Sequence, residues 1–150
     1  LSFVLYVGIA IFLTGIVLII SAIANNGTLV TPHLVLGDTE KEKATKNIEG
    51  IKMEYFDTVH NGMRQAVTYG TAGALNVPYV DVAAKTGTAE LGARKDRINS
   101  WVVGFLPYEN PKYAFVIMME SGPAEGSVGA AATMRQLLDW MSIYTPEYFE

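Results

Sequence analysis

Residues 1–24 contain no charged side chain, and apolar residues occupy most of their positions. About 20 consecutive apolar residues are enough for a helix to cross the hydrocarbon core of a bilayer. A signal peptide would begin with basic residues and carry a shorter apolar core, and neither feature is present. A buried core helix and a pair of buried strands are alternatives, because periodicity alone does not separate helix from strand in such a run. We expect residues 1–24 to form one transmembrane helix and residues 25–150 to form the folded domain behind it.

Two later segments have apolar residues at spacings of three and four, which is typical of one face of an amphipathic helix. The first runs from about Tyr55 to Tyr69, and Gly70 is placed to end it. The second runs from about Val128 to Ile143. Ahead of these helices, Thr28–Leu36 is expected to be extended chain, and the charge-rich Gly37–Gly50 is expected to be a solvated loop.

Three segments have the composition of β-strands: Asn76–Ala89, Trp101–Phe105 and Lys112–Met119. The link Leu106–Pro111 is short and rich in turn residues, which favours an antiparallel hairpin. Because strands that follow one another along the chain are usually neighbours, the second segment should lie between the other two. The third is apolar at nearly every position, so both of its faces should be covered. The predicted fold class is α+β, an antiparallel sheet with flanking helices.

Charge and composition narrow the range of functions. The formal net charge is −4, and nucleic-acid binding normally needs a basic face, so we expect no nucleic-acid partner. The chain has no cysteine, which excludes disulfide bonds and thiolate chemistry. Only two histidines, His33 and His60, are present, and so few ligands do not predict a structural zinc site. We expect neither a metal nor a cofactor.

The segment Lys85-Thr86-Gly87-Thr88 has residue types that suit the binding of an acyl or peptide substrate. Lysine offers a point charge to a carboxylate, and threonine hydroxyls can donate to the same group. Glycine lets a ligand backbone come close, and the free amides of an edge strand can pair with an extended peptide. We therefore expect this segment on an edge of the sheet. The Val128–Ile143 helix should cover one face, and the other face should be open or covered by the first helix.

Lys85-Thr86-Gly87 matches Lys-Thr-Gly, one of three motifs of penicillin-binding proteins and class A β-lactamases. Four flanking segments are similar to segments of the transpeptidases of peptidoglycan synthesis, in the expected order. They are Ile23–His33, Val59–Val67, Gly70–Ala72 and Asn99–Pro107. From Ser21 to Ser142 the chain resembles the C-terminal part of a class B penicillin-binding protein, and Trp101 and Glu120 favour the elongation type, which maintains cell shape. The resemblance implies part of the transpeptidase fold that these proteins share with β-lactamases.

The resemblance also implies a role for each matching residue. Lys85 would hold the substrate carboxylate and keep the site electropositive, and Gly87 would belong to the same substrate-binding strand. Thr86 and Thr88 would hydrogen-bond the substrate or the carboxylate of a β-lactam, and the amide of Thr88 would be one of two oxyanion-hole donors. The implied partners are a peptidoglycan stem peptide or a β-lactam, the membrane and other proteins of cell-wall synthesis. The implied location is the cell membrane, crossed once, with the globular part outside the cytoplasm.

The catalytic nucleophile of the family is missing from this sequence. No serine is followed by lysine three positions later or by asparagine two positions later, so Ser-x-x-Lys and Ser-Asp-Asn are both absent. An acyl-enzyme mechanism needs an activated nucleophile, so we expect the chain alone to be inactive and to form no adduct with β-lactams.

The apolar run stands where the family has a soluble helix, and we interpret it as the family's membrane anchor joined directly to this part of the domain. Two alternative functions stay open at this point. One is a non-catalytic, membrane-tethered module that uses the sheet edge for docking. The other is a relative of β-lactam sensors or β-lactamases.

Overall fold

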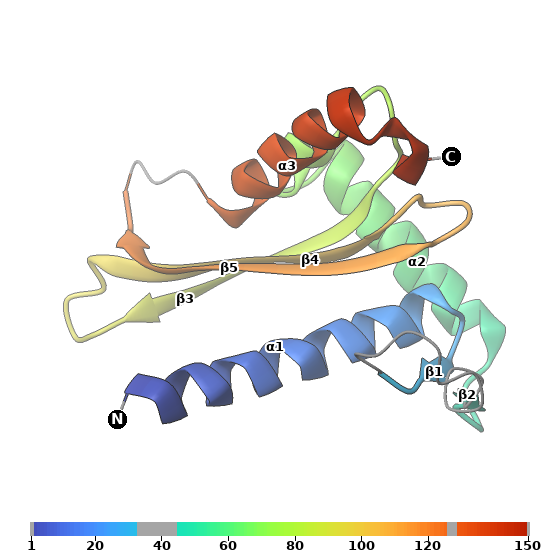
Figure 1. The fold of residues 1–150 in the computed structure, drawn as a ribbon, viewed down its shortest axis with the longest axis horizontal. Coiled ribbons are helices and arrows are strands. Elements are labelled where there is room, and N and C mark those ends of the chain that lie inside the picture. Colours follow the sequence, from blue (N-terminus) through green and yellow to red (C-terminus); the bar gives the residue numbers. More distant parts are fainter. Residues whose placement is uncertain (1, 33–44, 126–128, 150) are drawn as a thin grey trace.

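The computed structural model describes residues 2–32, 45–125 and 129–149, with residues 2–10 described by their backbone alone (Figure 1). Within these ranges the longer elements are α1 (Ser2–Ala24), α2 (Met53–Thr68), β3 (Ala83–Leu91), β4 (Arg97–Leu106), β5 (Tyr113–Pro123) and α3 (Ala130–Tyr144). The shorter elements are β1 (Thr28–Val30), β2 (Thr45–Asn47) and the 3₁₀ turns η1 (Gly73–Leu75) and η2 (Pro146–Phe149).

The strands β3, β4 and β5 form an antiparallel sheet with β4 in the middle. Figure 1 shows α3 above one face of this sheet and α1 running along the other face. The predicted α+β class, the strand order and the placement of the last helix are therefore confirmed. The other face was expected to be open or covered by the first helix, and the first helix covers it.

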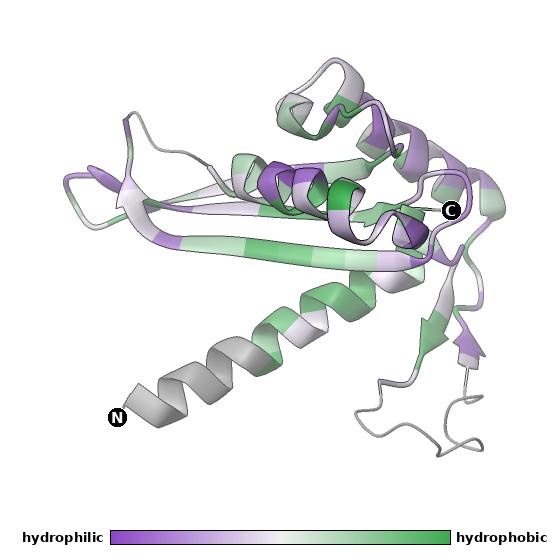
Figure 2. Ribbon diagram, turned by 45° about the horizontal axis from the view of Figure 1, so that its top comes forward, coloured by the Kyte–Doolittle hydropathy of each residue, from purple (hydrophilic) through white to green (hydrophobic). Residues whose placement is uncertain are grey.

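Alternate side chains of the sheet build two apolar layers. On the α3 side the buried cluster includes Val102 and Leu138, and on the α1 side it includes Ile20, Ala83 and Phe105. Because successive side chains of a strand point to opposite faces, the odd-numbered residues of β3 face α1 and the even-numbered ones face α3. Figure 2 shows that the apolar residues of β5 lie in the middle of the strand, where the two helices cover the sheet.

Helix α1 packs on protein, and the structure does not support the predicted membrane span. In the part of the chain that is described, no helix is both long and apolar enough to cross a bilayer. Ile20 and Ala24 are buried against the sheet, and the ring of Phe12 meets the ring of Trp101 edge-on at 6.1 Å. An uncharged apolar run is explained equally by burial against protein and by burial in lipid, and hydropathy does not separate the two.

The helix predicted from about Tyr55 to Tyr69 is confirmed as α2. One residue of its predicted apolar stripe, Val59, is nevertheless 42% exposed. The imidazole Nε2 of His60 lies 2.7 Å from the carbonyl oxygen of Ile23, so α2 is linked to the end of α1.

The strand predicted from Asn76 is paired only from Ala83 onward. The apolar residues in front of it, including Val80 and Val82, are buried as unpaired chain in the cluster beneath α3. The other two strands extend beyond their predicted apolar segments, and Arg97 of β4 pairs with Pro123 of β5. Strand pairing therefore continues past the covered part of the sheet, where polar residues give no hydrophobic signal.

The strand β5 packs on both faces, as its continuous apolar sequence predicted. Ile117 contacts the α3-side cluster and Ala114 the α1-side cluster. The small strand β2 was not predicted, because it lies in the charge-rich segment expected to be a loop, and it pairs with β1. The rest of that loop and the end of the predicted extended chain, residues 33–44 with His33, lie outside the described residues, as does Val128 at the start of the predicted last helix.

Candidate substrate-binding edge

The strand β3 is an edge strand, as the binding argument required. Lys85 pairs with Val103, Gly87 with Trp101 and Thr88 with Ser100, all on β4. In the described part of the chain β3 has no second neighbour. Its outward N–H and C=O groups therefore have no strand partner there and can pair with an extended ligand.

Lys85 is exposed and, by strand alternation, belongs to the face that α1 covers. Its ammonium Nζ donates to the Thr86 carbonyl oxygen at 2.6 Å. Among the described residues no carboxylate forms an ion pair with Lys85. The positive charge at this edge is therefore available to an anionic ligand.

Thr86 and Thr88 lie on the opposite, α3-facing side of the same strand. Thr88 is exposed and Thr86 is half-buried. The hydroxyl oxygen of Thr86 lies 2.6 Å from that of Thr71, in the turn after α2. That turn belongs to the segments that resemble the family, but no role for Thr71 could be predicted, because a contact between hydroxyl groups leaves no hydrophobic pattern.

Gly87 stands between these side chains and is half-buried. A Cβ added at Gly87 would lie 3.4 Å from the Cβ of Trp101, which is an ordinary contact. The fold therefore does not require glycine at this position. Its absent side chain leaves the edge open to close approach by a ligand backbone.

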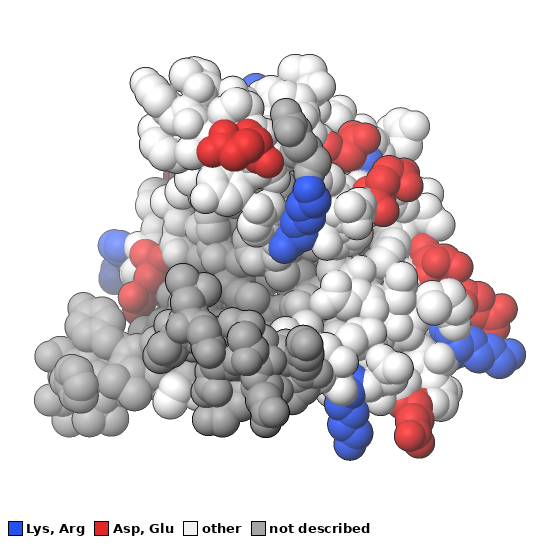
Figure 3. Space-filling view, turned by 45° about the vertical axis from the view of Figure 1, so that its right-hand side comes forward, with Lys and Arg blue, Asp and Glu red and all other residues white. Residues whose placement is uncertain are grey.

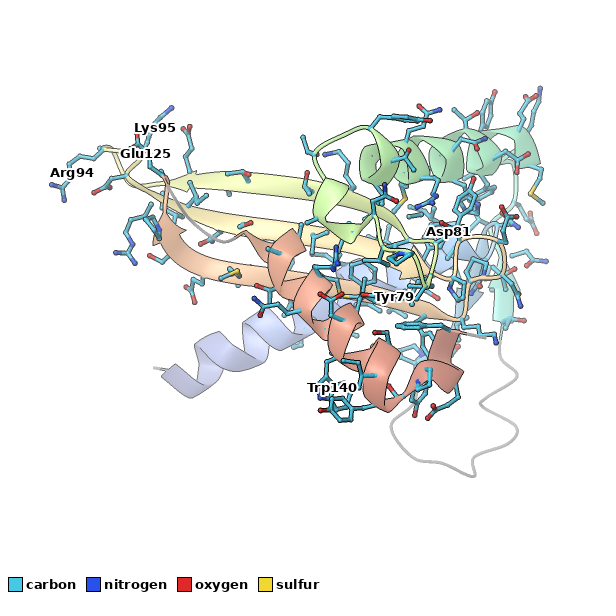
Figure 4. The ribbon with its side chains drawn as sticks, turned by 90° about the horizontal axis from the view of Figure 1, so that it is seen from above. Tyr79, Asp81, Arg94, Lys95, Glu125 and Trp140 are labelled. Carbon is cyan, nitrogen blue, oxygen red and sulfur yellow. The ribbon has the colours of Figure 1, made fainter. Side chains whose placement is uncertain are left out.

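Three polar contacts hold the chain in front of β3. Arg64 of α2 donates from Nη1 to the carbonyl oxygen of Val82 at 3.1 Å and also bonds the carboxylate of Asp81. The hydroxyl of Tyr79 donates to Asp139 Oδ1 on α3 at 2.5 Å, and Figure 4 shows Tyr79 beside that helix. These contacts join the chain in front of β3 to α2 and α3.

The Tyr79 contact also shifts two pKa values. Burial, together with the hydrogen bond to Asp139, raises the pKa of Tyr79 to about 12. The bond from Tyr79, followed by those from Arg135, holds the pKa of Asp139 below its usual range. Arg135 Nε contacts both carboxylate oxygens of Asp139, at 2.8 and 2.9 Å. Asp139 therefore stays ionised and Tyr79 stays neutral at ordinary pH.

The charged and metal-ligating side chains that are present limit the reactions that this edge could take part in. In the described ranges no group of three or more His, Cys, Asp or Glu side chains could hold a metal ion. On the face that Figure 3 shows, the basic side chains lie scattered among acidic and uncharged ones. The edge offers a positive charge and backbone groups without a strand partner among the described residues, but the sequence holds no Ser-x-x-Lys nucleophile for acyl transfer.

A family model described as the penicillin binding protein transpeptidase domain matches residues 7–139. The chain belongs to this family and forms part of that domain. The match begins inside α1, whereas the sequence resemblance began only at Ser21. The first helix is thus within the matched domain, and the structure places it on the sheet.

Peptidoglycan transpeptidases of several bacteria are similar to this chain over most of its length. The peptidoglycan D,D-transpeptidase MrdA of Salmonella typhimurium (strain SL1344) is 30% identical over 143 residues, covering 79% of this chain and 23% of the relative. A solved D,D-transpeptidase domain of a peptidoglycan glycosyltransferase from Eggerthella lenta has a TM-score of 0.65 and 29% identity, covering 85% of this chain and 31% of its own.

A solved complex of the penicillin-binding protein PBP2 with MreC, from Helicobacter pylori, has a TM-score of 0.64 and 25% identity, covering 82% of this chain and 23% of that chain. Of MrdA, the relative described above, this chain spans about a quarter of the length.

Proposed function

We propose that this chain is the substrate-binding portion of a peptidoglycan D,D-transpeptidase and that the edge of β3 binds the D-alanyl-D-alanine end of a stem peptide or a β-lactam. The observation that carries the proposal is the Lys-Thr-Gly segment on a free edge strand, in a chain that belongs to the transpeptidase family. The named activity of MrdA supports the substrate class.

Each residue has a role in this proposal. The ammonium of Lys85 comes from the other face of the strand but lies 2.6 Å from the Thr86 carbonyl oxygen, and from there it attracts the terminal carboxylate. The hydroxyls of Thr86 and Thr88 donate hydrogen bonds to the same carboxylate. The ligand backbone pairs along β3 beside Gly87, as an added strand does. The amide of Thr88 donates to the carbonyl oxygen of the terminal peptide bond, which develops negative charge during acyl transfer in family members that carry the catalytic serine.

The covalent step is not assigned to this chain. Acyl transfer by this family needs an activated serine, and no serine here has the surrounding motif. The chain should therefore bind the peptide reversibly and not turn it over.

Titration of the isotopically labelled chain with an N-acyl-D-Ala-D-Ala peptide, followed by NMR, tests this function. Amide shifts should move along β3, and the L-Ala-L-Ala peptide should bind far more weakly. Lys85→Met should weaken binding about tenfold, since a charge-assisted hydrogen bond is lost. Lys112→Met, which removes an exposed lysine at the β4–β5 link, is the matched control and should bind normally. Shifts confined to regions away from β3 would contradict the proposal.

A second candidate is a non-catalytic docking module, favoured by the missing nucleophile. It would use the same edge to pair with an extended segment of another protein. Such a surface would bind the peptide backbone and would discriminate little between D- and L-residues beside a terminal carboxylate. Equal binding of the D,D and L,L peptides, with no effect of Lys85→Met, would favour this candidate.

We also propose that the chain acts in cell elongation, on the outer side of the cytoplasmic membrane. The similarity to MrdA supports the elongation type, and the MreC-bound relative suggests a partner of the cell-wall machinery. Protease accessibility in intact spheroplasts tests the location. Helix α1 packs on the sheet. The proposed location outside the cytoplasm therefore does not assume that residues 1–24 cross the bilayer.

A further inference from the structure

Thr71 lies in the turn after α2, next to the substrate edge, and the fold holds its backbone on both sides. A Cβ added at Gly70 would lie 2.9 Å from the Cα of Ala66, so the turn is tight. The amide of Ala72 donates to the Ala66 carbonyl oxygen at 2.9 Å, and the Ala72 side chain is fully buried. The position of the Thr71 Cα and Cβ atoms beside β3 is therefore set by the fold and not by a ligand.

The hydroxyl groups of Thr71 and Thr86 contact each other. The two hydroxyl oxygens are 2.6 Å apart, which is a good distance for a hydrogen bond between hydroxyls. A threonine side chain has staggered χ1 rotamers, and only a rotamer that directs its hydroxyl toward Thr71 can form this bond. The neighbouring Thr68, by contrast, donates its hydroxyl within α2, to the carbonyl oxygen of Arg64 at 3.2 Å.

The direction of this hydrogen bond follows from the chemistry of the ligand. A hydroxyl group has one proton to donate and two lone pairs to accept with. An ionised carboxylate only accepts, so Thr86 must use its single proton for a bound carboxylate. Thr71 must then donate to Thr86, and a hydroxyl that accepts one bond donates the next more strongly.

We propose that Thr71 is a positioning residue of the substrate edge. It holds Thr86 in the rotamer that a ligand carboxylate needs. It also leaves the hydroxyl proton of Thr86 free to be donated to that carboxylate. The carboxylate part of this inference rests on the proposed function, whereas the control of the Thr86 rotamer stands without it. A merely structural tie between the turn and β3 would change unfolding but not the binding.

The test compares Thr71→Val, which keeps the shape and removes the hydroxyl, with Thr71→Ser, which keeps the hydroxyl. Thr68→Val is the matched control, since it removes a neighbouring hydroxyl that bonds only within α2. Three-bond couplings report the χ1 populations of Thr86 in the unliganded chain. Titration with the N-acyl-D-Ala-D-Ala peptide reports Kd, and urea unfolding reports stability.

Wild type, Thr71→Ser and Thr68→Val should each show one dominant Thr86 rotamer, and Thr71→Val should show averaged couplings. Thr71→Val should raise Kd about fivefold, the usual effect of losing one hydrogen bond, and Thr71→Ser should restore most of the affinity. Unchanged Thr86 couplings in Thr71→Val would overturn the inference. Altered couplings with an unchanged Kd would overturn the role in binding. If wild type binds no peptide, the proposed function fails, and the couplings still decide whether Thr71 positions Thr86.

Discussion

At the scale of single residues, two glycines of the sheet serve different purposes. A Cβ added at Gly104 of β4 would lie 2.7 Å from the Cζ of Phe115 and would also collide with the backbone of Ala83. A Cβ added at Gly87 of β3 would make only an ordinary contact with Trp101. Packing therefore requires the glycine in the middle strand, whereas the glycine on the edge strand leaves room for a ligand.

Gly104→Ala should lower the free energy of unfolding by about 1–3 kcal/mol, the usual cost of overpacking a core. Gly87→Ala should change it by less than about 0.5 kcal/mol, yet it should weaken binding of the D-Ala-D-Ala peptide because its methyl group occupies the edge. Urea unfolding and peptide titration measure the two effects. The proposed role of Gly87 is wrong if the Gly87→Ala variant is strongly destabilised or binds the peptide as tightly as the wild type does.

At the scale of elements, α1 stabilises the domain through one side. Ile20 is 7% exposed and lies in the cluster beneath the sheet, whereas its neighbour Ile19 is 62% exposed. Ile20→Ala should lower the free energy of unfolding by about 2–4 kcal/mol through lost burial and a new cavity. Ile19→Ala should cost less than about 0.5 kcal/mol. Tryptophan fluorescence during urea unfolding measures both, and equal costs would mean that α1 does not pack on the sheet as described.

The bond between Tyr79 and Asp139 joins the chain before β3 to α3 and gives stability a dependence on alkaline pH. The folded pKa of Tyr79, about 12, lies above the value of about 10 expected for an unfolded tyrosine. At a pH between these two pKa values, the tyrosine loses its hydroxyl proton in the unfolded chain but keeps it in the folded chain, and this favours unfolding. The contribution is therefore complete below about pH 10 and is lost as the pH rises through about 12.

Tyr79→Phe should lower the free energy of unfolding by about 1 kcal/mol near neutral pH through the lost hydrogen bond. It should also flatten the loss of stability above about pH 10. Urea unfolding across alkaline pH checks this, with Tyr69→Phe as the control because Tyr69 is 90% exposed. A wild-type alkaline slope retained in Tyr79→Phe would show that other groups cause it.

At the scale of the whole molecule, the proposed substrate edge occurs in a sequence that has no Ser-x-x-Lys nucleophile. Incubation with fluorescent penicillin should therefore give no labelled band that survives denaturing electrophoresis. A full-length transpeptidase of the same family, acylated in parallel, is the positive control. A labelled band from this chain would show that one of its own side chains acts as a nucleophile.

The sequence alone predicted much of this molecule, because the signals were local. Apolar spacing located α2 and α3, and β-rich segments located the strands of the sheet in their order. Lys85-Thr86-Gly87 was recognised as a motif, and its edge position followed from the need for free amides. These properties depend on residues close together in the chain, so a pattern along the chain records them.

Only the tertiary structure decided what covers each surface. It placed the uncharged first helix against the sheet, since hydropathy does not distinguish a protein interior from a bilayer. It brought Thr71 to Thr86 and Tyr79 to Asp139, pairs that are distant in sequence and whose polar side chains carry no periodic signal. It also showed that Gly104 is required by packing and Gly87 is not, because that difference depends on neighbours from other strands.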